Sequence, residues 1–202
     1  MLGLALGWWL YVPIHELLHA YGCLWTGGEV TRLEIDALYG GAWLAEALPF
    51  VEVGSEYAGQ LTGFDTRGSD AIYLATDLAP FLLTVFPGVW ALRRFGGRGQ
   101  AVRFGLVLPL ALAPFLSVTG DAYEIGSILV TQLPPWTEAA MSELLRGDDL
   151  FLAFERVRAA EPSPWGGWFL AGVVGVLWAF ATYGAGAVVA RWLSSGRVEE
   201  AP

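Results

Sequence analysis

The sequence predicts an all-α integral membrane protein with about four transmembrane helices and a small β-hairpin after the first helix. Three observations support this fold class. Hydrophobic residues make up 55% of the 202 residues and charged residues only 15%, whereas soluble domains carry roughly 25% charged residues. Four apolar stretches are long enough to cross about 30 Å of hydrocarbon as helices. A short segment that alternates with the period of a β-strand follows the first stretch.

The predicted elements follow one another without a repeat. They are a helix over residues 1–26, a hairpin and loop over 27–70, a helix over 71–95, a broken helix over 101–133, an amphipathic loop over 134–164 and a fourth helix with its tail over 165–202. We expect residues 1–133 to form the core. The first helix should be retained in the membrane, because no Lys or Arg precedes Arg32 and a cleavable signal begins with a basic region.

The hairpin is predicted from the segment "EVTRLEID". Thr31, Leu33 and Ile35 fall on one face of the strand and charged residues on the other. The Gly40–Gly41 pair indicates a turn, and "AWLAEAL" would be the second strand. From residue 53 to residue 69 the alternation fades, so this part is expected to be a glycine-rich loop.

The later spans have their own signals. Pro109, Pro114 and the polar group "TGDAYE" interrupt the third span, which predicts a broken helix. Small residues in the fourth span suit close packing between helices. The connection 134–164 should hold two short amphipathic helices at the membrane interface, with Asp148 as N-cap of the second.

Charge restricts the partners and the orientation. The net charge is −9, every basic residue is Arg and no long basic run occurs, so nucleic acid is excluded as a partner. The single Cys23 excludes an internal disulfide and a multi-cysteine metal site. The turn between the second and third spans holds four Arg (Arg93, Arg94, Arg98 and Arg103). The positive-inside rule then places this turn and both termini in the cytoplasm, and we expect a multi-pass protein of a prokaryotic cell membrane.

The motif "HELLH" carries the chemistry. His15 and His19, the only two histidines of the chain, lie four residues apart and would project from one face of a helix, where they can bind one Zn²⁺. Glu16 is placed to take a proton from water at the metal and to pass it to a leaving amine. The alternative is that the three side chains satisfy one another inside a helical bundle. Ionisable groups in a membrane helix cost a few kcal/mol each, which favours the metal site.

A third ligand is needed, and it must be a carboxylate because no third histidine exists. Asp77, Asp121 and Glu124 lie within apolar spans. Asp121 is preferred because it follows Gly120 in the interrupted third span, although a helix cap is the competing interpretation. Glu124, three residues later on roughly the same face, is either a substitute ligand or a partner of the ligand.

Three segments resemble the site-2 protease-type intramembrane metalloproteases. "HELLHAYGCLWTGGEVTRLEI" resembles the first core helix and following strand of that family. "ATDLAPFLL" (residues 75–83) is similar to its second-helix motif AGPLANFLL. "APFLSVTGD" (residues 113–121) is a looser counterpart of NxxPxxxLDG, whose Asp is the third zinc ligand. The resemblance covers roughly residues 5–130 and implies zinc held by His15, His19 and Asp121, with Glu16 as general base and then acid.

The chain departs from the family at several positions. Pro80 stands where the second motif has Asn, and Asp77 where it has Pro. The Asn of the third motif is missing, and Gly precedes Asp121 instead of following it. In the family the motif-bearing end of the first helix usually faces the cytosol, which is opposite to the orientation that the Arg residues predict.

The function expected from the sequence is zinc-dependent proteolysis of other membrane proteins, within or next to their transmembrane segments. An unwound substrate segment would add as a strand to the hairpin at Thr31, Leu33 and Ile35. The alternative is a non-proteolytic membrane protein that retains the metal site for binding or assembly. A transporter is less favoured, because four spans without an evident inverted repeat are atypical of that class. The oligomeric state stays open.

Overall fold

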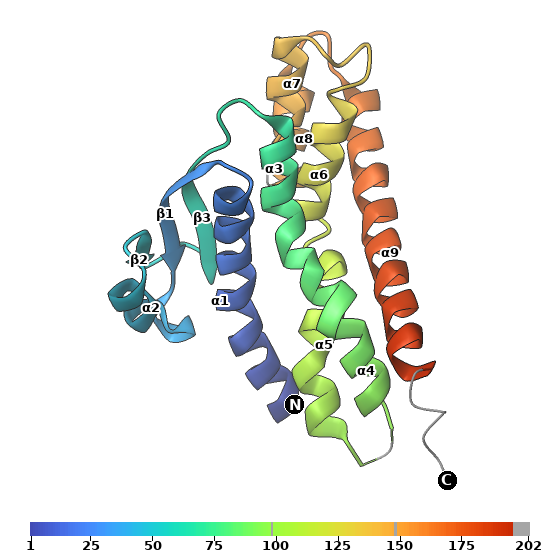
Figure 1. The fold of residues 1–202 in the computed structure, drawn as a ribbon. Helices are drawn as coiled ribbons and strands as arrows, with labels where there is room; N and C mark the ends of the chain where they lie inside the picture. Colours follow the sequence, from blue (N-terminus) through green and yellow to red (C-terminus); the bar gives the residue numbers. More distant parts are fainter. Residues whose placement is uncertain (98, 148, 196–202) are drawn as a thin grey trace. The chain divides into compact units, whose positions relative to one another are not determined.

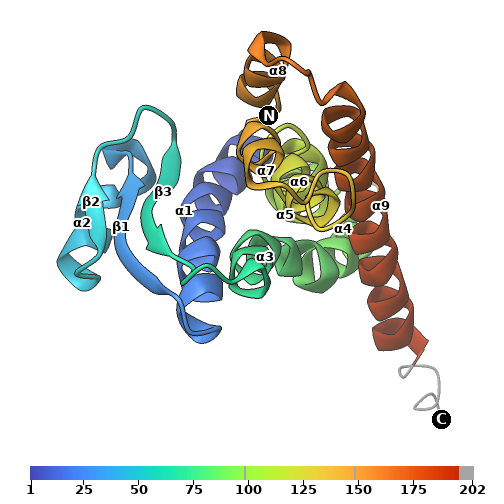
Figure 2. The same cartoon turned by 90° about the horizontal axis from the view of Figure 1, so that it is seen from above.

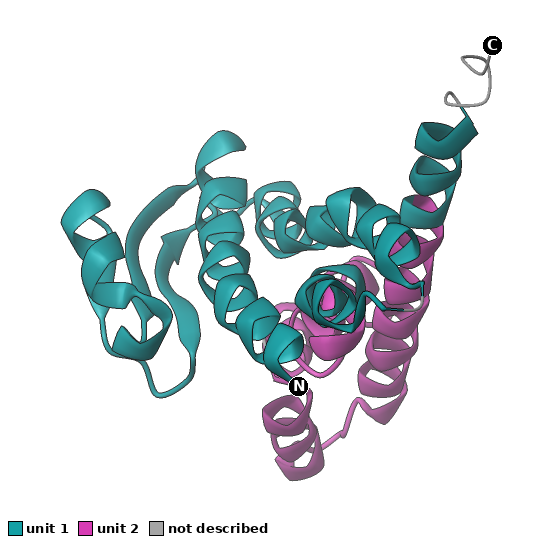
Figure 3. Ribbon diagram, turned by 90° about the horizontal axis from the view of Figure 1, so that it is seen from below, with its two compact units in different colours: residues 1–112, 186–202 teal, residues 113–185 magenta. Residues whose placement is uncertain are grey.

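The computed structural model describes residues 1–97, 99–147 and 149–195. The chain is mostly helical, with one small three-stranded sheet (Figure 1 and Figure 2). Its contacts divide it into two compact units, residues 1–112 together with those from 186 onward, and residues 113–185 (Figure 3). The predicted helical character is confirmed, and the predicted division of the chain at residues 133 and 164 stays a prediction.

Three helical segments are long and apolar enough to cross a membrane. They are Asp70–Phe95, Ala101–Val130 and Trp165–Ser195, and they coincide with the second, third and fourth predicted spans. Their length and composition are consistent with a membrane protein. The first predicted span does form a helix, α1 (Leu2–Trp25), but it is not one of the three. A fourth span therefore stays a prediction.

The sheet lies in the first unit. After α1 the chain forms β1 (Glu29–Ile35), a 3-10 turn η1 (Ala37–Tyr39), α2 (Gly41–Ala47), β2 (Val51–Val53) and β3 (Gly59–Asp65). The strand order is β2-β1-β3, with β1 parallel to β2 and antiparallel to β3. Leu33 and Ile35 of β1 are fully buried in a core cluster with Ala20 of α1 and Leu44 of α2.

The predicted hairpin is wrong in its second strand. "AWLAEAL" forms α2, because Ala, Leu and Glu favour a helix more strongly than the turn signal favours a strand. The antiparallel partner of β1 is β3, from a segment expected to be a loop. Gly59 and Gly63 have no side chain, so the alternation of apolar and polar residues that predicts a strand is weak in β3. A Cβ on Gly63 would come within 2.6 Å of Thr31 Oγ1, so the glycine permits the close approach of the two strands.

A long, irregular helical segment follows. Ser69 is the N-cap of α3 (Asp70–Leu78), and its hydroxyl oxygen accepts a hydrogen bond from the Ile72 N–H. The segment continues through η2 (Ala79–Phe81) and the π-helical η3 (Thr84–Gly88) into α4 (Val89–Phe95). Phe86 has extended backbone angles (φ −157°, ψ 133°), as expected for a residue that precedes a proline.

α1 lies between the sheet and α3 (Figure 2). Glycines allow its neighbours to approach closely. A Cβ on Gly22 would come within 2.6 Å of the Ala75 carbonyl oxygen in α3. A Cβ on Gly7 would overlap the carbonyl oxygen of Leu106 in α5 (Ala101–Leu116). Small residues at helix contacts are typical of packing in lipid, where van der Waals contact replaces hydrophobic association.

The second unit contains α6 (Asp121–Val130), α7 (Ala139–Leu145), α8 (Leu150–Ala159) and residues 165–185 of α9 (Trp165–Ser195). α6 and α9 touch through backbone, because a Cβ on Gly126 would overlap the Ala171 carbonyl oxygen. The two predicted short helices are present as α7 and α8. The predicted cap Asp148 lies outside the described residues, and the Asp149 carboxylate caps α8 by accepting from the N–H groups of Phe151 and Leu152.

The close contact between α1 and α5 predicts opposite effects for one substitution at two glycines. Gly7→Ala should destabilise the protein by about 1–3 kcal/mol, because the added methyl group meets backbone that cannot move aside. Gly184→Ala is the matched control. It lies inside α9 with no neighbouring atom within 4 Å of the added Cβ, so it should be neutral or stabilising by up to about 1 kcal/mol. Thermal unfolding in detergent measures both, and equal effects would contradict the packing described.

Candidate metal centre

His15 and His19 lie one helical turn apart on α1, two residues after Pro13. Both are buried, with 8% and 7% of their surface exposed. Their rings are nearly perpendicular, with centroids 4.8 Å apart. Burial of two imidazoles on one helix face agrees with the spacing seen in the sequence, since residues i and i+4 share a face.

A backbone carbonyl determines the tautomer of His19. The Nδ1 atom of His19 lies 3.0 Å from the carbonyl oxygen of Thr76 in α3. A carbonyl can only accept, so Nδ1 carries the proton and donates it to this bond. The neutral imidazole then has its lone pair on Nε2, which is the atom that faces His15. A metal ligand needs this lone pair, and the fold supplies it in place.

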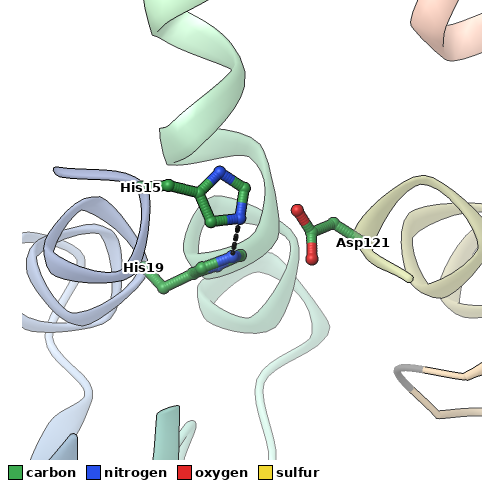
Figure 4. A group of neighbouring side chains, drawn as sticks. All are labelled: His15, His19 and Asp121. Carbon is green, nitrogen blue, oxygen red and sulfur yellow. Dashed lines mark hydrogen bonds between the residues drawn. The ribbon is translucent and has the colours of Figure 1, made fainter. Parts of the chain in front are cut away.

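The two Nε2 atoms have the separation that a shared metal ion requires. They lie 3.2 Å apart (Figure 4). Two imidazole nitrogens bound tetrahedrally to zinc at about 2.0–2.1 Å would be about 3.3 Å apart. The separation of the two Nε2 atoms is therefore compatible with a shared metal ion.

Tyr11 can support His15 both without and with a metal. The Tyr11 hydroxyl lies 2.8 Å from His15 Nδ1, and Tyr11 is 4% exposed. Without a metal, His15 Nε2–H donates to the His19 lone pair, and the Tyr11 hydroxyl donates to Nδ1. If a metal were held by both Nε2 atoms, His15 Nδ1–H would donate to the Tyr11 oxygen. A hydroxyl can do either, because it is both donor and acceptor.

The third member of the group is Asp121. Among the described residues, His15, His19 and Asp121 form a group that could hold a metal ion. Each offers one ligand atom, and these atoms all lie within 4.8 Å of one another (Figure 4). Two histidines and one carboxylate are a donor set that catalytic zinc sites use.

The local structure argues against a capping role for Asp121. It is the first residue of α6, and Gly120 occupies the N-cap position. The Asp121 N–H donates to the Ser117 hydroxyl at 3.1 Å. The helix break between α5 and α6, predicted from the interrupted third span, therefore makes Asp121 the first residue of α6, one position after the N-cap.

The two other predicted carboxylates are outside the group found among the described residues. Asp77 follows Thr76 in α3 and is 2% exposed. Glu124 lies in the first turn of α6 and is 6% exposed, and its carbonyl oxygen accepts from the Ser127 hydroxyl. Their predicted roles as substitute ligands or ligand partners stay predictions.

Glu16 lies on the side of α1 that faces the sheet. A Cβ on Gly59, the first residue of β3, would be 2.6 Å from Glu16 Cγ and 3.3 Å from Cδ. Glu16 is half-buried, and a side chain at position 59 would require the Glu16 side chain to shift. The sequence reasoning missed Gly59 because it placed this residue in a loop. The glycine itself was the only signal, and it could not indicate its neighbour.

The predicted substrate-binding strand needs correction. Leu33 and Ile35 are fully buried in the core, and only Thr31 of the three is exposed. β1 is also the central strand, paired on both sides between Leu33 and Ile35. A segment cannot add to a strand whose backbone groups are already paired. The edge strand next to α1 is β3, which begins beside Glu16.

Comparison with known proteins adds no relative. No protein-family model, no curated protein and no solved structure matches the chain. The resemblance to site-2 proteases therefore stays a prediction from the three sequence motifs.

Removing the Tyr11 hydroxyl should weaken metal binding. Tyr11→Phe keeps the ring that contacts His15 and removes only its hydrogen-bond partner. Loss of such a partner typically costs about 10–100-fold in metal affinity. Tyr21→Phe is the control, because Tyr21 is on the same helix but stacks on Trp25. Zinc dissociation constants measured against a competing chelator should differ between the two variants. Equal constants would show that Tyr11 does not support His15.

Proposed function

We propose that this protein is an intramembrane zinc metalloprotease of site-2 protease type. It would hydrolyse peptide bonds within or next to transmembrane segments of other proteins. The observation that carries the proposal is the buried histidine pair, with Nε2 atoms 3.2 Å apart and the lone pair of His19 directed at His15. The glutamate between them and the apolar helices of the chain support the same class.

The metal would be held by His15, His19 and Asp121. Zinc in such a site acts as a Lewis acid and makes water a nucleophile at neutral pH. Glu16 would accept the proton that the attacking water loses and deliver it to the leaving amine. Its neighbour Gly59 leaves room for the side chain at the start of β3.

Substrate recognition would use the edge of β3. Peptide bonds in a membrane helix are satisfied internally, so a substrate must unwind before it can be cut. An unwound segment gains hydrogen bonds by pairing with an exposed strand edge. β3 is an edge strand of the sheet β2-β1-β3, and its first residue touches Glu16. A strand added there would pass close to the proposed general base.

Metal analysis tests the site and its third ligand together. The detergent-purified wild type should contain about one zinc per chain, as expected for a mononuclear site. His15→Ala and Asp121→Asn should lose it, and Glu124→Gln should keep it. Wild-type protein without stoichiometric zinc would overturn the proposed function. Loss of zinc in Glu124→Gln with retention in Asp121→Asn would assign the third ligand to Glu124.

Proton transfer by Glu16 is tested without disturbing the metal. Glu16→Gln should keep zinc and lower cleavage of a co-expressed single-span membrane protein by about 10²-fold or more, because the amide cannot accept the proton. Glu46→Gln on α2, an exposed position, is the charge-matched control and should cleave normally. Cleavage that survives in Glu16→Gln would exclude this mechanism.

Gly59 gives an independent test of the placement of Glu16. Gly59→Ala should lower kcat while zinc content stays at the wild-type level, since the added methyl group would displace the Glu16 side chain. Gly97→Ala is the control, because no atom of the described residues, its two chain neighbours aside, lies within 4 Å of the Cβ added there. Unchanged kcat in Gly59→Ala would show that the contact has no part in turnover.

The second candidate is a membrane protein that binds the metal without proteolysis. The substitutions in the family-like motifs favour it, above all Asp77, a buried carboxylate where the family has Pro. Stoichiometric zinc in the wild type, together with no cleavage of any co-expressed membrane protein, would select this function.

A further inference from the structure

A cavity of about 260 Å³ lies between the C-terminal ends of α4 and α9. Trp90, Arg93 and Arg94 of α4 line one side, and Leu193 and Ser194 of α9 line the other. All five residues belong to the first unit. The cavity shares no residue with the metal centre, so its function can be argued independently of the proposed proteolysis.

The lining is positively charged in a protein whose net charge is −9. Arg93 and Arg94 contribute two guanidinium groups, and none of the five lining residues is acidic. Arg93 Nη1 donates to the carbonyl oxygen of Ala187 in α9 at 3.3 Å, which holds this side chain across the two helices. Guanidinium groups bind phosphate oxygens through paired hydrogen bonds, which a compact ammonium group cannot do.

The cavity lies at the ends of two candidate membrane spans. One span ends at Phe95 and the other at Ser195. Segments of 26 and 31 residues are longer than the roughly 20 residues that cross the hydrocarbon, so their ends, with the lining residues, would lie at or beyond the level of the headgroups. Trp90 lines the cavity, and Trp192, which precedes the lining residue Leu193 in the chain, is 73% exposed. Indole rings prefer this level of a bilayer.

We propose that this cavity binds the phosphate group of an anionic phospholipid headgroup. Arg93 and Arg94 contact the phosphate, while Trp90 and Leu193 border the apolar part of the lipid. The volume is below the roughly 300–1,000 Å³ of sites that enclose a whole small molecule. It suits a phosphate with part of its glycerol, while the acyl chains remain in the bilayer. The Arg-rich turn that follows α4 favours the cytoplasmic leaflet, where anionic lipids attract basic residues.

Lipid retention measured by native mass spectrometry tests the site. Purified protein in neutral detergent is mixed with phosphatidylglycerol, with phosphatidylcholine or with inorganic phosphate alone. The wild type should retain phosphatidylglycerol about 10-fold better than phosphatidylcholine. Both lipids offer a phosphate to the guanidinium groups, but the choline group of phosphatidylcholine adds a positive charge that Arg93 and Arg94 repel. Arg93→Ala/Arg94→Ala should abolish this preference. Arg103→Ala/Arg191→Ala is the matched control, because it removes the same charge from exposed positions outside the lining, and it should keep the preference.

A lysine variant separates recognition from folding. Arg93→Lys/Arg94→Lys keeps the charge and loses the paired hydrogen bonds, so it should retain less phosphatidylglycerol than the wild type at an unchanged unfolding temperature. Equal retention in wild type and Arg93→Ala/Arg94→Ala would overturn the proposal. Binding of inorganic phosphate without preference for phosphatidylglycerol would also overturn the lipid assignment and identify free phosphate as the ligand.

Discussion

The hydrogen bond from His19 Nδ1 to the Thr76 carbonyl oxygen is the interaction on which the centre depends. It sets the tautomer of His19 and turns its lone pair towards His15. It also requires α3 to come close to α1, and Gly22 permits this approach because any side chain there would meet the backbone of Ala75 and Thr76. A single glycine, three residues after the motif, therefore helps to determine the chemical state of a histidine.

The polar side chains of α1 contact different elements on different sides of the helix. The histidines contact α3 and Tyr11, and Glu16 and Ala20 contact the sheet and its core. The two histidines and Glu16, all on α1, are thus contacted by different neighbouring elements. α1 carries two histidines and a glutamate within an apolar sequence. Its polar groups are buried by protein, and such burial is how ionisable residues are tolerated in a membrane protein.

The accuracy of the sequence-based predictions depended on how local the signal was. The helical character of the chain and an interruption of the third span were predicted correctly, because apolar length and a polar group act on neighbouring residues. The break falls between α5 and α6 at the polar group, and Pro109 and Pro114 lie inside α5. The second strand of the hairpin was wrong, because a Gly-Gly turn signal says nothing about the conformation of "AWLAEAL". The true partner, β3, was missed since its two glycines carry no side chain to alternate. Leu33 and Ile35 were assigned to substrate although their strand is central and buried.

The sequence by itself determined the residue types and their spacing on α1: two histidines on one face, with a glutamate next to the first. These follow from the helical period and need no information about distant residues. The tertiary structure decided which atoms of these side chains are available. The contact of His19 with Thr76 joins residues 57 apart in the chain, and Gly59 reaches Glu16 only through the sheet. Such contacts depend on packing between separate elements, which no local pattern records.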